Sequence, residues 1–235
     1  MSPRLLLSLA IAAVAVIWQL PYGAQALYPF TLLATYAHEL GHGLAALTVG
    51  AEFEQLLLHP DGSGLARWRG NPGPLAQAWI AAGGLIGPTL AGVSLLLLSR
   101  SPRHARILLG IGAAVVMLTV LLWARNAFAI LFLLAVALIF AAAARWLADA
   151  AAAFLLHFVA VLLCLSWFSD LGYMFSAHAI VGGIARPSDS AQIANALFLP
   201  YWFWGGVVAS VSLGLLLLGL AVAYRTGDAV DKRVD

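Results

Sequence analysis

Long apolar runs separated by short polar connections extend along the chain to about residue 224. A helix needs roughly 20 consecutive apolar residues to cross the hydrocarbon core of a bilayer. Seven runs approach this length: 5–22, 27–50, 75–98, 107–123, 127–146, 151–175 and 201–224. The fourth and fifth are only three residues apart, so they form either a tight hairpin of spans or partly re-entrant segments. The pattern predicts an all-α polytopic membrane protein with about seven transmembrane helices, in a range of six to eight.

Two connections are long enough to hold structure of their own. In residues 51–74, two strand-like runs flank the turn signal Pro60-Asp61-Gly62, which predicts a small β-hairpin directly after the second apolar run. Residues 176–200 contain Gly182-Gly183 and the polar run Ser188-Asp189-Ser190. We see no internal repeat, and we interpret residues 1–235 as a single integral membrane domain.

The composition supports this class and excludes others. Of the 235 residues, 63% are hydrophobic and only 9% are charged, whereas soluble domains carry about 25% charged residues. This excludes a disordered chain and disfavours a soluble globular one. The only cysteine excludes a disulfide scaffold, and a net charge of +2 indicates no nucleic-acid partner. Arg4, the first apolar run and Ala24-Gln25-Ala26 also imitate a secretory signal, but we favour an uncleaved first span.

The second apolar run carries the strongest chemical signal, His38-Glu39-Leu40-Gly41-His42. This is an H-E-x-x-H pattern, in which two histidines at i and i+4 share one helix face and can hold one Zn²⁺. Glu39 is then placed to act as general base toward a zinc-activated water. Ionisable groups inside a membrane helix are costly and are usually functional, so we prefer a metal site to a structural polar network. Gly41 and Gly43 leave room for a close helix neighbour or a substrate backbone.

Two histidines leave a catalytic zinc short of one protein ligand. Our first choice for the third ligand is Asp170, near the end of the sixth run, because the second and sixth runs cross the membrane in the same direction. Asp189 is the alternative, although it also suits a solvated loop or a helix N-cap. His157 and His178 remain further possibilities.

The pattern around His38–His42 resembles the site-2 protease family of zinc intramembrane metalloproteases, and most closely its compact bacterial branch. Over about residues 35–204 the resemblance is carried by the H-E-L-G-H run and four later motifs, namely Pro60–Gly64, Ala82–Pro88, Asp170 and Ser188–Ala191. It implies that His38 and His42 bind one zinc ion, that Glu39 activates water and that a later aspartate completes the site. It also implies a multi-pass protein of the bacterial inner membrane.

The function implied is zinc-dependent intramembrane proteolysis, with hydrolysis of peptide bonds in or near transmembrane segments of other membrane proteins. The predicted hairpin would either pair with an unwound substrate strand or simply cap the site. Family members typically place Leu-Asp-Gly at the third ligand and an asparagine after a Gly-Pro; this chain has Ser169-Asp170-Leu171-Gly172 and Gly87-Pro88-Thr89. These departures keep a non-catalytic metal-binding scaffold open as an alternative. A metal or proton transporter is the other.

Overall fold

The computed structural model describes residues 3–99 and 101–231, and its elements are mostly helices. In chain order they are α1 (Pro3–Gln19), α2 (Gly23–Thr48), β1 (Glu52–Leu58), β2 (Gly64–Arg69), α3 (Pro74–Leu98), α4 (Pro102–Leu122), α5 (Ala127–Trp146), α6 (Asp149–Ser169), α7 (Leu171–Met174), β3 (His178–Val181), β4 (Ile184–Pro187), α8 (Asp189–Ala196) and α9 (Tyr201–Asp231).

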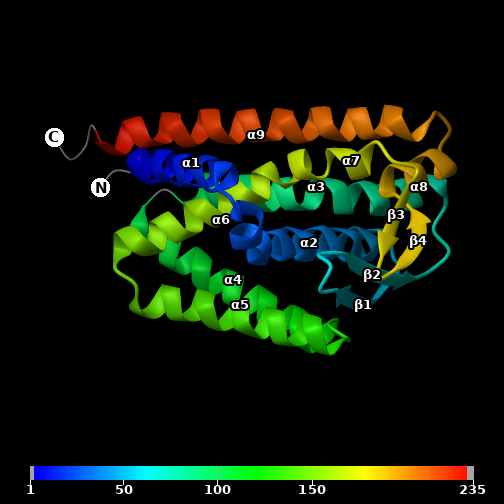
Figure 1. The fold of residues 1–235 in the computed structure, drawn as a ribbon, viewed down its shortest axis with the longest axis horizontal. Coiled ribbons are helices and arrows are strands. Elements are labelled where there is room, and N and C mark those ends of the chain that lie inside the picture. The colour runs from blue at the N-terminus through cyan, green and yellow to red at the C-terminus, as the bar shows by residue number, and fades with distance from the viewer. Residues whose placement is uncertain (1–2, 100, 232–235) are drawn as a thin grey trace.

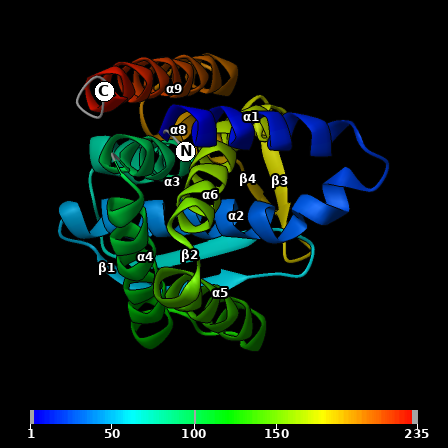
Figure 2. The ribbon, with the colours of Figure 1, turned by 90° about the vertical axis from the view of Figure 1, so that its left-hand side faces the viewer.

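Helix α3 lies at the centre of the arrangement and packs against α2, α6, α8 and α9. Helix α9 runs along one side of this group, while α4 and α5 form a helical hairpin on the opposite side (Figure 1). Both small sheets and α8 lie toward the same end of the molecule (Figure 1). Figure 2 looks along the bundle from the other end, where α1 and α6 lie between α9 and the α4–α5 hairpin. The end that carries the sheets is where α2, α8 and the two hairpins come together.

Five helices of the described chain are long and apolar enough to cross a membrane: α3, residues Arg103–Leu122 of α4, α5, α6 and residues Tyr201–Tyr224 of α9. The chain is therefore an integral membrane protein. The apolar part of α1 is shorter, and α2 falls outside this group although it has 26 residues. The predicted number of seven spans is thus not confirmed. Helix α2 also carries His38, Glu39 and His42, polar groups that are held inside the protein.

The hairpin predicted after the second apolar run is confirmed. Strands β1 and β2 pair antiparallel, with Leu58 opposite Gly64 and Glu52 opposite Arg69. A second antiparallel hairpin, β3–β4, forms in the later connection, where the sequence analysis assigned no strand. The sixth apolar run also ends earlier than expected: α6 stops at Ser169, and the one-turn helix α7 follows.

Helix α2 makes two unusually close contacts through its glycines. A Cβ atom on Gly41 would collide with the carbonyl group of Gly83 in α3, and one on Gly43 would collide with the ring of Phe53 in β1. Only glycine permits so close an approach at these positions. The close helix neighbour predicted for these glycines is therefore confirmed at Gly41, where it is α3, whereas Gly43 makes room for a side chain of the hairpin.

The outer edge of β1 is closed by the loop between α4 and α5. The Leu56 N–H donates to the carbonyl of Trp123 at 2.7 Å, and the Leu56 carbonyl accepts from the N–H of Arg125 at 3.3 Å. The Asn126 side-chain amide then takes the place of a further strand residue: it accepts from the Leu58 N–H at 3.3 Å and donates to the Leu58 carbonyl at 2.6 Å. Because unpaired strand edges are costly inside a membrane protein, this loop stabilises the hairpin.

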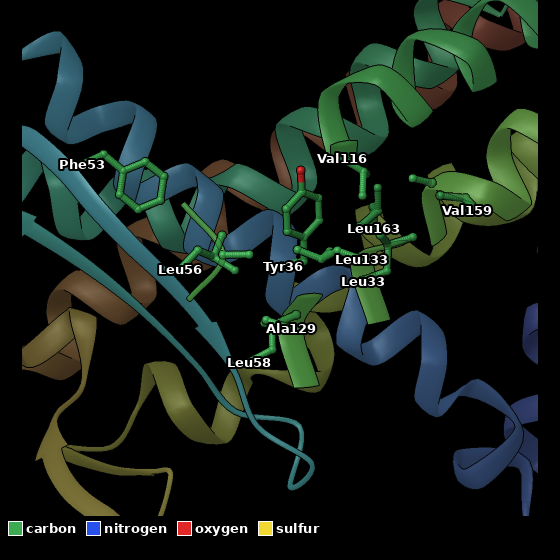
Figure 3. Close-up of a cluster of buried hydrophobic side chains, with 12 residues drawn as sticks. Leu33, Tyr36, Phe53, Leu56, Leu58, Val116, Ala129, Leu133, Val159 and Leu163 are labelled. Carbon is green, nitrogen blue, oxygen red and sulfur yellow. The ribbon is translucent and has the colours of Figure 1, made fainter. Parts of the chain in front are cut away.

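Between the hairpin and the helices lies a buried apolar cluster that joins β1 to the bundle (Figure 3). Leu56 and Leu58 are fully buried. They pack with side chains of α2, α4, α5 and α6, which include Leu33, Tyr36, Val116, Leu133, Val159 and Leu163. The hairpin is therefore fixed to the bundle both by its edge hydrogen bonds and by its apolar face.

Replacement of Asn126 by alanine tests this attachment. The variant leaves the N–H and the carbonyl of Leu58 without their side-chain partner, and we expect a loss of about 1–3 kcal/mol in the free energy of unfolding. The measurement is thermal unfolding in detergent. The exposed Asn71→Ala variant serves as the control and should match wild type. Equal midpoints for both variants would contradict the proposed role of the amide.

Candidate metal centre

Three possible metal ligands converge where α2 meets α8. Nε2 of His38 lies 3.0 Å from Nε2 of His42. Oδ2 of Asp189 lies 2.9 Å from the first of these nitrogens and 3.2 Å from the second. The three side chains are only 15%, 11% and 3% exposed, respectively. In the described part of the chain, this His–His–Asp cluster is the one group of three or more such residues with ligand atoms close enough to share an ion.

The hydrogen bonds of His42 leave electron pairs facing one another inside the cluster. Nδ1 of His42 lies 2.8 Å from the carbonyl oxygen of Ile80, and a carbonyl only accepts, so Nδ1 carries the proton. In neutral His42, Nε2 therefore presents a lone pair toward Oδ2 of Asp189, which is also an acceptor. One proton on His38 cannot satisfy both contacts to Oδ2. A metal ion or an additional proton must therefore lie between the lone pairs of His42 Nε2 and Asp189 Oδ2.

The chemistry of these donors suits a metal ion. Two imidazole nitrogens and one carboxylate oxygen are a ligand set typical of a catalytic zinc site, which has three protein ligands and one open position. A second hydrogen bond from the far ring nitrogen, such as that from His42 to Ile80, is also typical of metal-bound histidine. The residues present therefore fit a metal ion.

Helix α8 brings Asp189 to the histidines. Ser188 caps the helix, because its Oγ accepts from the Ala191 N–H at 3.2 Å. Asp189 is thus the first residue of α8 and is buried, whereas the sequence analysis weighed a solvated loop or an N-cap for it. Burial opposes its charge, but the facing histidines outweigh burial and hold the pKa of the Asp189 carboxyl below its usual range.

Two further side chains hold the Asp189 carboxylate. The Tyr173 hydroxyl of α7 donates to Oδ2 at 2.9 Å, and the same hydroxyl oxygen accepts from the Asp189 N–H at 3.1 Å. The Gln192 amide donates to Oδ1 at 2.9 Å. Burial, together with the Asp189 charge, raises the pKa of the Tyr173 hydroxyl. Tyr173 therefore keeps its proton at neutral pH.

Glu39 is oriented by the first hairpin. Its Oε2 accepts from the Ala66 N–H of β2 at 2.6 Å. A Cβ atom on Gly64 would lie 2.6 Å from Cγ of Glu39, so the strand passes directly over the glutamate. The turn of the hairpin is tied to the same helix, because the Thr35 hydroxyl donates to the Gly62 carbonyl at 2.8 Å.

A cavity opens beside these groups. His38 and Glu39 line it on α2, and Gly62–Gly64 of the hairpin turn form a second wall. Residues of α6, α7 and β3 complete the lining, and Trp18 contributes from α1. A molecule in this cavity would therefore meet His38 of the cluster and the glutamate.

The structure separates the two aspartates that the sequence suggested. Asp170 follows the last residue of α6 and lines the cavity, but it does not belong to the His–His–Asp cluster. The chain leaves α6 at this point, so that Tyr173, one turn later, is the residue that contacts Asp189. His157 is buried in α6 with Nδ1 next to the Ala153 carbonyl at 2.7 Å, and His178 is exposed on β3. Neither belongs to the cluster.

Sequence reasoning did not find Tyr173, Gln192 or the Ile80 carbonyl. The spacing of Asp189 and Gln192, three residues apart on one helical turn, was the only local signal for such a contact. Tyr173 and Ile80 lie on other helices, and no sequence pattern links them to the cluster.

Comparison with known proteins gives one match. The family model described as Peptidase M50B-like matches residues 6–219. No curated protein matches the chain, and no solved structure does. The match confirms the resemblance to the site-2 protease family, and peptidases of this family are metal-dependent.

Gly84 of α3 provides a test of the His42 position. A Cβ atom there would collide with the imidazole of His42, so Gly84→Ala should displace the ring and sharply reduce the metal bound per chain. The measurement is metal content of the purified protein after metal is resupplied. Gly110→Ala is the matched control, because a Cβ on this helical glycine meets nothing within 4 Å. Full metal content in Gly84→Ala would show that the ring does not need this space.

Proposed function

Because the chain belongs to the M50B-like peptidases of the site-2 protease family, we propose that it is a zinc-dependent intramembrane endopeptidase. Its substrates are transmembrane segments of other membrane proteins, and it works in the bacterial inner membrane. The observation that carries the proposal is the convergence of His38, His42 and Asp189, with His38 and the neighbouring Glu39 lining one cavity.

His38, His42 and Asp189 are the proposed zinc ligands. Asp189 takes the place first given to Asp170, since its Oδ2 is the carboxylate oxygen next to both histidine nitrogens. Bound zinc supplies Lewis-acid polarisation of the scissile carbonyl and activates water at neutral pH. Glu39 accepts the proton of the attacking water and passes it to the leaving amine. The hydrogen bond from the Ala66 N–H holds one carboxylate oxygen of Glu39 in place for this work.

An extended substrate would lie along the outer edge of β2. Alternate residues of a strand direct their N–H and C=O groups to opposite edges. On β1, the N–H and C=O groups of Leu56 and Leu58 are hydrogen-bonded to the loop 123–126. Their partners on β2 are Ala66 and Gly64. The N–H and C=O groups of these two residues therefore point to the opposite edge, toward α2 and the cavity. The Ala66 N–H is already hydrogen-bonded to Glu39, so an added strand would pair with the remaining backbone groups of this edge and lie next to Glu39. The hairpin would thus both cover the site and present the substrate.

Metal content of aspartate variants tests the ligand assignment. Wild type purified in detergent should hold about one zinc per chain. We expect His42→Ala and Asp189→Ala to lose it and Asp170→Ala to keep it, because only Asp189 contacts the histidines. Zinc lost from Asp170→Ala but kept in Asp189→Ala would return the third ligand to Asp170. Well-folded wild type that binds no zinc would remove the proposed chemistry.

Glu39→Gln tests the peptidase reaction itself. The amide cannot accept a proton from water, so cleavage should fall by about 10²–10⁴-fold while zinc is retained. The assay is fragment formation from a panel of tagged single-span membrane proteins in proteoliposomes. Glu52→Gln, whose side chain is exposed, is the matched control and should cleave like wild type.

The outcome also separates the competing functions. Cleavage that persists in Glu39→Gln would exclude this mechanism. Zinc binding without Glu39-dependent cleavage of any tested segment would favour the non-catalytic scaffold, and zinc uptake that requires His38 would favour the transporter.

A further inference from the structure

We propose that Tyr173 and Gln192 are positioning residues that allow Asp189 to offer a metal ion a single lone pair of Oδ2. They thereby set the affinity of the site for metal and restrict it to low coordination numbers. This inference rests on the metal site of the proposed function, and it adds two residues that act on the ion through Asp189.

The hydrogen bonds of the Asp189 carboxylate leave one lone pair of Oδ2 free to face a metal ion. An ionised carboxylate has two lone pairs on each oxygen. The Tyr173 hydroxyl occupies one lone pair of Oδ2 at 2.9 Å. The Gln192 amide donates to the other oxygen, Oδ1, at 2.9 Å. The remaining lone pair of Oδ2 faces the two histidine nitrogens, at 2.9 and 3.2 Å.

The contacts also prevent rotation of the carboxylate. The Tyr173 oxygen accepts from the Asp189 backbone N–H as well as donating to its side chain, so the two residues form a closed ring of hydrogen bonds. The Tyr173 ring lies edge-on to His38, with centroids 6.1 Å apart. Tyr173 therefore touches two of the three proposed ligands, and Asp189 is 2% exposed.

A fixed one-oxygen contact affects which ion the site prefers. Ca²⁺ and similar hard cations take six to eight oxygen ligands, often from bidentate carboxylates. Because Oδ1 is hydrogen-bonded to Gln192 and Oδ2 is the oxygen next to both histidines, the cluster offers two nitrogens and one oxygen, which suits a four-coordinate ion with one open position. The second contacts of metal ligands typically contribute 10–100-fold in metal affinity.

Tyr173→Phe is the direct test, since it removes only the hydroxyl. We expect zinc affinity, measured by competition with a chromogenic chelator, to fall at least tenfold. With Co²⁺ in place of zinc, we expect the intense visible absorption of a four-coordinate ion to weaken, because a released carboxylate can bind through both oxygens. Neither measurement requires a substrate or catalytic turnover.

Tyr224→Phe is the matched control. It also removes one phenol hydroxyl, which lies 3.0 Å from Ser8 Oγ of α1. The C-terminal part of α9 lies at the end of the bundle opposite the two sheets (Figure 1). The zinc affinity and Co²⁺ spectrum of this variant should equal those of wild type. If Tyr173→Phe does not fold, Gln192→Met replaces it. Gln192 is exposed, and the thioether cannot donate to Oδ1, so the same loss of Co²⁺ absorption is expected.

The possible outcomes are distinguishable. Wild-type affinity and an unchanged Co²⁺ spectrum in Tyr173→Phe, or an unchanged spectrum in Gln192→Met where that variant is used, would overturn the inference but leave the metal site intact. Wild-type protein that binds neither zinc nor Co²⁺ would overturn the metal site and this inference with it. Equal losses in Tyr173→Phe and Tyr224→Phe would show that the effect is not specific to the carboxylate and would also overturn the inference.

Discussion

Asp189 places a carboxylate in the interior of a membrane protein, and the charge of this group must be balanced where it lies. Two histidine nitrogens face it at 2.9 and 3.2 Å, and the ring of His42 has its proton on its other nitrogen, next to the Ile80 carbonyl. Charges removed from water are stable only when they are paired and hydrogen-bonded. The two histidines, Tyr173 and Gln192 around Asp189 meet this requirement.

Close packing of the backbones brings the histidines and their partners into position. Helix α3 approaches α2 at Gly41 and leaves space for His42 at Gly84. The same contact brings the Ile80 carbonyl to the ring. On the other side, β2 passes over Glu39 at Gly64. Small residues thus allow two elements to reach one helical turn, and this places both His42 and Glu39.

The two hairpins have different relations to the bundle. Strand β1 is fixed by the apolar cluster and by the loop at Asn126, so its outer edge is closed to other strands. The outer edge of β2 faces α2 and the cavity. The β3–β4 hairpin contributes to the opposite wall and touches the first turn, because the Gly182 N–H donates to the Ser63 hydroxyl at 3.1 Å. The cavity between these hairpins is therefore framed by backbone as well as by side chains.

The sequence by itself predicted the helical membrane class, the first hairpin, the family and the pair of histidines with Glu39. These depend on local patterns: apolar length, a turn signal and residues one helical turn apart. The sequence also restricted the third ligand to a few residues, with Asp170 placed ahead of Asp189. Only the tertiary structure placed Asp189 in the cluster, because the break after Ser169 and the burial of α8 against α3 depend on contacts between distant segments. The same applies to Tyr173 and Ile80, whose positions result from packing between helices and leave no periodic signal in the chain.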